Sequence, residues 1–191
     1  IWIAPVLWLA CVVGLVSAQE GAAASAGEDT GPVYAARVLE GDPETFTPLG
    51  SLAEESPFEA ELSFSPFGAG IEALTLAHHF VTDKQESHVT VQHARTIDGI
   101  EAIPFALLAV EIEGQRVDLV GLEAPVWSET ETGHFEAIIQ DDSGAEIARI
   151  ERRFELAERG YDIILNQTLT NLTPDPIRVR WIQTGPISMP K

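Results

Sequence analysis

The chain has 191 residues, enough for one domain with a sizeable core plus a leader and a linker, but too few for two full domains. Its 30 acidic residues outnumber 11 basic ones, giving a formal net charge of −19 that repels nucleic acid and anionic lipid surfaces. The composition therefore argues against nucleic acid as a partner, and it names no substrate.

The chain opens with an apolar segment, residues 1–18 (IWIAPVLWLACVVGLVSA), which contains no charge. It is nearly long enough to cross a hydrocarbon core of about 30 Å as a helix. Two interpretations stay open: a signal peptide cut after Ala18, or an uncleaved anchor with further residues upstream of Ile1. The only cysteine, Cys11, is followed by apolar residues, which disfavours a lipoprotein. In both cases we expect the chain from Gln19 onward to be exported.

Residues 19–45 are rich in Ala, Gly, Ser, Pro and acidic residues. Such a composition cannot bury enough apolar surface to offset chain entropy, so we predict a disordered, flexible linker. One short strand is expected within it, at Tyr34–Leu39.

From Phe46 to the end at Lys191 the apolar residues recur with period two, which predicts strands with one buried face. The clearest case is residues 145–156 (AEIARIERRFEL), in which Arg152 interrupts the predicted buried row. The turn 158–160 and the strand 161–172 complete a long hairpin, and a further strand follows the turn 173–176. Earlier strands are expected at 58–64, 71–76, 88–93, 105–114, 115–120 and 134–141.

About nine or ten strands in all, without a required helix, predict an all-β antiparallel β-sandwich over residues 46–191, with a small closed barrel as the alternative. We expect this domain to be truncated at its C-terminal end. In the turn FSPFGAG, Gly68 and Gly70 are expected to supply positive φ or close packing between strands.

The five histidines are the first candidates for chemistry: His78, His79, His88, His93 and His134. Adjacent histidines on a strand point to opposite faces, and the chain has no HExxH motif and no Cys–His spacing, so no metal site is predicted.

Other motifs give no catalytic set. The chain lacks a G-x-S-x-G elbow and a glycine-rich phosphate loop, and its acidic residues are too numerous for any pair to stand out. The sequons at Asn166 and Asn171 are expected to be ordinary polar positions of a strand. We therefore predict no catalytic, metal-binding or cofactor-binding residue.

Two stretches, LGSLAEESPFEAELSFSPFGAGIEALTL (49–76) and IERRFELAERGYDIILNQTLTNLTPDPIRVRW (150–181), together resemble the periplasmic region of the YidC family of membrane protein insertases, particularly planctomycete-like members. The order of the chain is similar too: an apolar segment, a low-complexity linker, then this domain, ending in GPISMP. Residues from about 78 to 127 carry no such resemblance, and the family's usual arginine in the small-residue turn is replaced here.

The resemblance implies a supersandwich-like domain, related in shape to mutarotase-like sugar-binding domains, on the periplasmic side of the bacterial inner membrane. It implies a non-enzymatic scaffold for secretion translocon components or nascent membrane proteins, with the apolar segment in the membrane. In the family, insertion is carried out by later transmembrane helices, so no residue of this chain inherits that role.

Two other classes of function stay open. One is a secreted mutarotase-like sugar-binding or sugar-processing protein, for which His79 and His134 with a glutamate would supply the catalytic set. The other is a secreted adhesive sandwich without particular chemistry.

The apolar segment gives a first testable prediction. A reporter that is active only after export, fused after Trp181, is expected to be active, because residues 1–18 carry no charge that would hold the chain in the cytoplasm. A reporter active only in the cytoplasm would contradict the predicted topology.

Overall fold

The computed structural model describes residues 31–41, 45–82, 84, 86–97, 100–120 and 124–186. Residues from Pro32 onward form one compact unit. The predicted apolar helix and most of the predicted linker lie outside the described residues. No helix within the described ranges has the length and apolar character needed to cross a bilayer.

The described residues form fourteen strands, and every pair is antiparallel, which confirms the predicted all-β class. The strands are β1 (Tyr34–Ala36), β2 (Leu49–Gly50), β3 (Ala60–Ser65), β4 (Gly70–Phe80), β5 (His88–His93), β6 (Arg95–Ile97), β7 (Ile100–Ala102), β8 (Leu107–Ile112), β9 (Gln115–Asp118), β10 (Ser128–Glu131), β11 (His134–Asp141), β12 (Glu146–Leu156), β13 (Ile163–Asn171) and β14 (Val179–Gln183).

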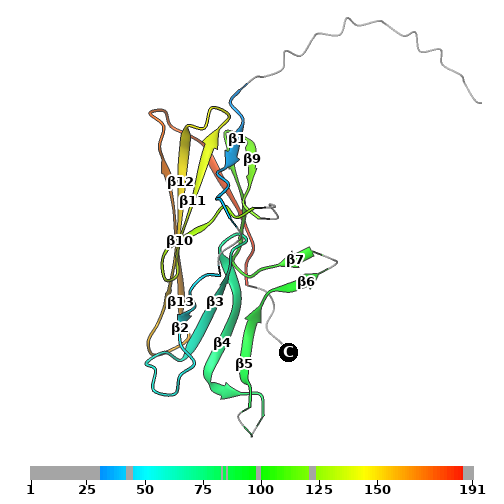
Figure 1. Cartoon of the computed structure of the whole chain (residues 1–191), viewed down its shortest axis with the longest axis vertical. Helices are drawn as coiled ribbons and strands as arrows, with labels where there is room; N and C mark the ends of the chain where they lie inside the picture. Colours follow the sequence, from blue (N-terminus) through cyan, green and yellow to red (C-terminus); the bar gives the residue numbers. More distant parts are fainter. Residues whose placement is uncertain are drawn as a thin grey trace, which may run out of the picture. The chain divides into compact units, whose positions relative to one another are not determined.

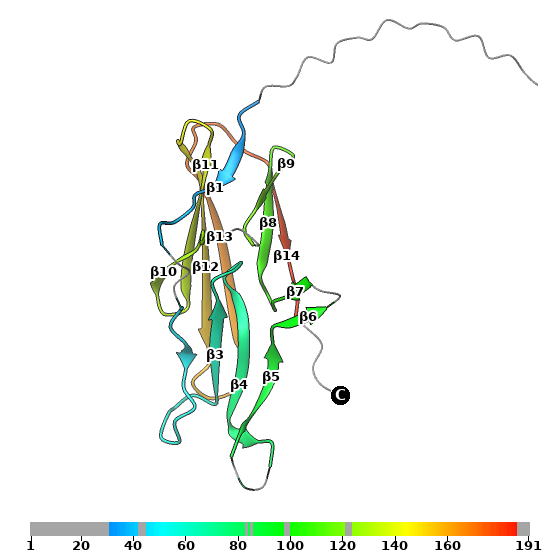
Figure 2. The same ribbon diagram turned by 45° about the vertical axis from the view of Figure 1, so that its right-hand side comes forward.

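The strands form two layers. One layer is the sheet β1-β11-β12-β13, with β10 also paired to β11. The other contains two sheets, β2-β3-β4-β5 and β14-β8-β9, which follow one another along the length of the long strands β11–β13 (Figures 1 and 2). A small ribbon, β6-β7, extends from the second layer.

The core between the layers contains a cluster of four phenylalanine rings. Phe135 of β11 lies 4.6 Å from Phe46 and 5.0 Å from Phe64, measured between ring centroids. Phe64 of β3 lies 5.0 Å from Phe154 of β12. All four rings are buried, and aromatic pairs at such distances stabilise a core beyond their buried area alone.

The turn between β3 and β4 confirms the expectation for its glycines. Gly68 has φ +73°, in the left-handed region where a side chain is strained. Gly70 permits close packing instead: a Cβ added there would lie 2.7 Å from the Ile103 side chain and 2.9 Å from the Ala106 backbone. The turn can therefore pack directly against residues 103–107, the segment that leads into β8.

The compact unit starts earlier than the predicted boundary at residue 46. The short strand β1 pairs with β11, and Ala36 belongs to the core, so part of the predicted linker is structured. The strands β2, β6, β7 and β10 were not predicted, because a strand of two to four residues shows no measurable period.

The packing of Gly70 can be tested by substitution. Gly70→Ala is expected to lower the free energy of unfolding by about 1–3 kcal/mol, because the added methyl group would overpack the segment 103–107. Gly185→Ala is the control: a Cβ there meets nothing within 4 Å, and we expect a change within about 0.5 kcal/mol. Urea unfolding of both variants measures the difference, and equal values would refute the close approach at Gly70.

Candidate functional site

Arg152 is the largest polar side chain in the core, and it joins the two layers. It lies on β12, fully buried. Its Nη1 donates a hydrogen bond to the carbonyl oxygen of Gly68 at 2.5 Å, and its Nη2 donates to that of Phe105 at 2.5 Å. These two carbonyls belong to the β3–β4 turn and to the segment before β8, so one guanidinium holds both sheets of the second layer.

Both accepting turns have backbone conformations that are uncommon for residues with side chains. Ala69 has φ 42° and Phe105 has φ 57°. Such conformations persist only where the surrounding structure determines them. Here the surroundings include Arg152 and a hydrogen bond of 2.9 Å from Leu107 N to Gly68 O. We call this meeting of residues 68–71 with residues 103–107 the junction.

The charge of Arg152 is balanced by dipoles rather than by an acid. Burial lowers the pKa of its guanidinium to about 9, which leaves it protonated at neutral pH. Its Cζ lies 5.5 Å from the centroid of the Phe154 ring, within reach of a cation–π interaction. Its Nε is buried without a hydrogen-bond partner among the described residues. A guanidinium buried in this way stabilises the packing of the two layers, and it cannot contact a substrate in solution.

This finding corrects the prediction that Arg152 interrupts the buried row of β12. Ala148, Ile150, Arg152 and Phe154 all face inward, and Arg152 is as buried as its apolar neighbours. The alternation was predicted correctly, but an arginine was expected to be excluded from the core. It is accepted because the planar guanidinium reaches two carbonyls at once.

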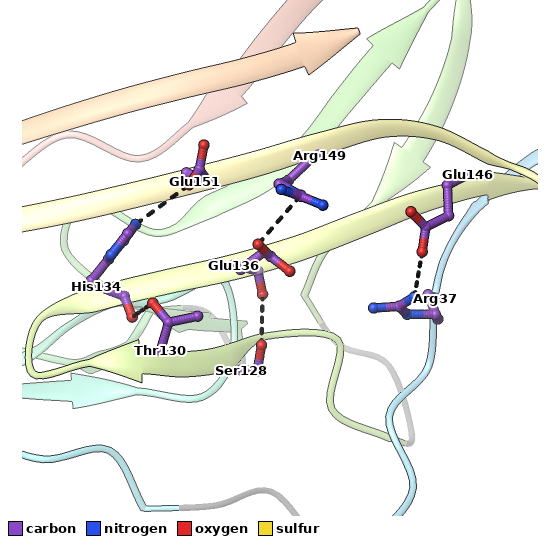
Figure 3. A network of polar contacts seen from close by, with 8 residues as sticks. All are labelled: Arg37, Ser128, Thr130, His134, Glu136, Glu146, Arg149 and Glu151. Atoms are coloured by element: carbon purple, nitrogen blue, oxygen red, sulfur yellow. Dashed lines mark hydrogen bonds and ion pairs between the residues drawn. The ribbon is translucent and has the colours of Figure 1, made fainter. Parts of the chain in front are cut away.

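The outward face of the first layer carries a network of charged side chains (Figure 3). Glu136 of β11 and Glu151 of β12 lie directly opposite each other, an arrangement in which like charges repel. Each has its own partner: Arg149 Nε lies 3.4 Å from Glu136, and the imidazole Nε2 of His134 lies 3.7 Å from Glu151.

A third pair lies beside β1: Arg37, the residue after this strand, lies 2.7 Å from Glu146. All of these pairs are partly exposed, so each contributes about 0–1 kcal/mol to stability. The outward face of the first layer thus carries acidic side chains that are each paired within the chain.

The histidines of β4 take separate partners. His78 Nε2 lies 3.7 Å from a carboxylate oxygen of Glu59, which precedes β3. His79 Nε2 lies 2.9 Å from the Tyr161 hydroxyl, in the loop between β12 and β13. Among the described residues, no group of three or more His, Cys, Asp or Glu side chains is arranged to hold a metal ion.

A surface hollow of about 380 Å³ lies beside the end of β4. It is lined by Glu54, His78, Phe80 and His88, together with Leu52 and Ala77. The rings of Phe80 and His88 lie 4.7 Å apart, and His88 Nδ1 lies 3.1 Å from the carbonyl oxygen of Leu76. A donation from Nδ1 to this carbonyl leaves Nε2 as an acceptor, so the hollow presents hydrogen-bonding groups beside an aromatic surface.

The structure does not bring together the histidines considered for a sugar-processing site. His79 bonds Tyr161, whereas His134 pairs with Glu151 on the outward face of the other layer. His88, which does line the hollow, was not singled out from the sequence. Its position depends on the register shifts between β4 and β5, which the sequence pattern does not reveal.

The geometry defines an antiparallel β-sandwich-like domain whose two layers are joined by a buried arginine. Comparison with protein-family models, with curated proteins and with solved structures found no match. The resemblance to the YidC family therefore stays a prediction from the sequence.

The role of Arg152 can be measured against its exposed neighbour. Arg152→Met removes both donors from the carbonyls of Gly68 and Phe105, and we expect it to lower the free energy of unfolding by about 2 kcal/mol or more. Arg153→Met removes only an exposed pair with Glu155, so a change within about 1 kcal/mol is expected. Chemical denaturation compares the two, and an Arg152→Met variant as stable as the parent would show that these hydrogen bonds contribute nothing net.

Proposed function

We propose that this chain contributes the periplasmic domain of a YidC-like membrane protein insertase and assists membrane protein insertion as a non-enzymatic scaffold. The observation that carries the proposal is the packing of the two stretches that resemble the family. Residues 49–76 and 150–181 face each other across the core, through the Phe64–Phe154 ring contact and the Arg152–Gly68 hydrogen bond. Segments that share a family's pattern are expected to form its common core, and these two do pack together.

In this proposal the sandwich has a supersandwich-like fold, and the segment 1–18 holds it at the bacterial inner membrane. The net charge of −19 disfavours contact with anionic lipid, so the domain contacts protein partners on the periplasmic side. Those partners are secretion translocon components or nascent membrane proteins. The paired charges of the outward face support recognition of such a partner, because complementary charges favour correct encounters more than tight binding.

The surface hollow favours a second candidate, a secreted mutarotase-like protein that binds or processes a sugar. An aromatic surface beside His78, His88 and Glu54 offers both stacking and hydrogen bonds to a sugar ring. Polarimetry with the purified protein separates the two candidates: anomer exchange that disappears in His88→Ala would favour this second one.

The scaffold proposal predicts that insertion itself is carried out by transmembrane helices outside residues 1–191, while this domain assists. Moving a polar-flanked helix into lipid requires a groove within the membrane, because polar backbone and charges are costly in hydrocarbon. The fragment 1–191 alone is therefore expected not to rescue cells depleted of their insertase, whereas a full-length protein with the later helices is expected to rescue them.

Deletion of residues 32–191 from that full-length protein, with a short flexible linker in their place, is expected to leave much of the rescue intact. Growth of the depleted cells is the measurement, and immunoblotting confirms that each protein accumulates. Rescue by the fragment alone, or complete loss of rescue by a well-expressed deletion, would overturn the assignment.

A further inference from the structure

One edge of the first layer lacks the features that natural proteins use to prevent strand addition. Within the described part of the chain, β13 pairs with β12 on one side and with no strand on the other. Its nine residues, Ile163–Asn171 (IILNQTLTN), contain no charge, proline or glycine, and its register is free of bulges. Long, regular and uncharged edges are templates for pairing with another chain.

The other edges are protected in the expected ways. β5 pairs with β4 through two register shifts. β14 carries Arg180 and a register shift of its own, and the four-residue strand β9 carries an ion pair between Arg116 and Asp118. β1 has three residues. β13 is therefore the edge most open to strand addition among those described.

The backbone register shows which groups of β13 are available. At one end of the hairpin Leu172 N donates to Ile147 O, and at the other Ala157 N donates to Asp162 O. The pairing between these ends is continuous, so the antiparallel ladder bonds the even-numbered residues 164–170 to β12. The N–H and C=O groups of the odd-numbered residues 163–171 point away from β12, toward the open edge.

Exposed apolar side chains lie on β13 and near both of its ends. The described residues include six large hydrophobic side chains that are exposed, and three of them lie on β13 or within two residues of its ends: Tyr161, Ile164 and Leu172, at 45%, 54% and 38% exposure. Leu165 and Leu169 pack against the core but stay only half-buried. A neighbouring strand would cover this surface.

Gln167, the central residue of β13, carries an unsatisfied buried atom. Its Nε2 donates to Gln183 Oε1 at 2.8 Å, while its Oε1 is buried without a hydrogen-bond partner in the described structure. Because this oxygen is buried within the single chain, a second copy cannot reach it, so Gln167 is available to a partner through its outward backbone N–H and C=O groups.

We propose that β13 is the interface of a two-fold symmetric dimer, in which it pairs antiparallel with β13 of a second copy of this chain. The axis passes through Gln167, whose outward backbone groups then pair with those of its own copy. Leu165 lies opposite Leu169 of the mate on the inward face, and Asn166 lies opposite Thr168 of the mate on the outward face. Two-fold interfaces require such self-complementarity, and the pairing places no charges opposite each other.

The choice of a second copy over another partner follows from the strand itself. A heterologous strand would need its own matching pattern, whereas the central residues of β13, Leu165–Leu169, already match their own reverse in polarity. The net charge of −19 on each chain opposes association through long-range repulsion, which salt screens. The dimer should therefore strengthen as salt concentration rises, while a basic partner peptide would bind more weakly.

The test measures the mass of the detergent-solubilised full chain by light scattering and sedimentation, from roughly 1 µM to 1 mM protein, a range that covers weak to moderate affinities. We expect a monomer–dimer equilibrium whose dissociation constant falls with added sodium chloride. Hydrogen exchange of peptides covering Ile163–Asn171 is expected to slow as protein concentration rises.

Two variants are designed to prevent pairing without unfolding the monomer. In Gln167→Pro the lost N–H points away from β12, so the hairpin ladder stays complete while the edge is blocked. Thr168→Lys places two cations beside the axis, and Thr168→Ser is its matched control. Each blocking variant is expected to raise the dissociation constant at least tenfold, and Thr168→Ser to leave it unchanged. A chain that stays monomeric throughout, or a dimer that both blocking variants leave intact, would overturn the proposal.

Discussion

The two layers of this protein depend on a single buried guanidinium. Arg152 extends from β12 in the first layer to the carbonyls of Gly68 and Phe105 in the second. A lysine would present one compact charge, whereas the planar fork of arginine can bond two carbonyls at fixed spacing. Three features lie at this contact: the positive φ angles of Ala69 and Phe105, the close packing at Gly70, and the meeting of the two sheets of the second layer. An apolar side chain at this position would leave the carbonyl oxygens of Gly68 and Phe105 without these donors, and arginine supplies both.

The distribution of charge explains how so acidic a chain can still present a defined surface. Outside the core, six of the described arginines, at positions 37, 116, 149, 153, 178 and 180, each pair with a specific acid. At Glu113, hydrogen bonds from the backbone N–H of Arg178 and then from its side chain lower the pKa of the carboxyl group. The few cations therefore fix local geometry, and the remaining acids set the long-range field. At long range an approaching partner experiences the negative electrostatic field of the chain, and at contact it finds the uncharged strand β13. Substitutions can alter these two properties separately.

The strands with clear alternation were predictable from the sequence, and so were the roles of Gly68 and Gly70, because both follow from local rules. Arg152 was not, since its burial depends on carbonyls 47 and 84 residues away in the chain. The hollow at His88 was missed for the same reason, because register shifts between β4 and β5 decide which side chains line it. The pattern of one strand predicts which of its faces is buried, but the partner of a polar group on that face comes from the tertiary structure.

The position of β12 explains why the domain can be firmly joined at its centre and open at its edge. β12 pairs on both sides, with β11 and with β13, and it supplies Arg152 to the junction. Among the described residues β13 has a strand on one side only, and its inward leucines are half-buried. Edge strands open at lower free energy than central ones, so β13 is expected to open more readily than β12. Pairing with a second copy adds contacts along the outer side of β13, and it does so without changing the junction.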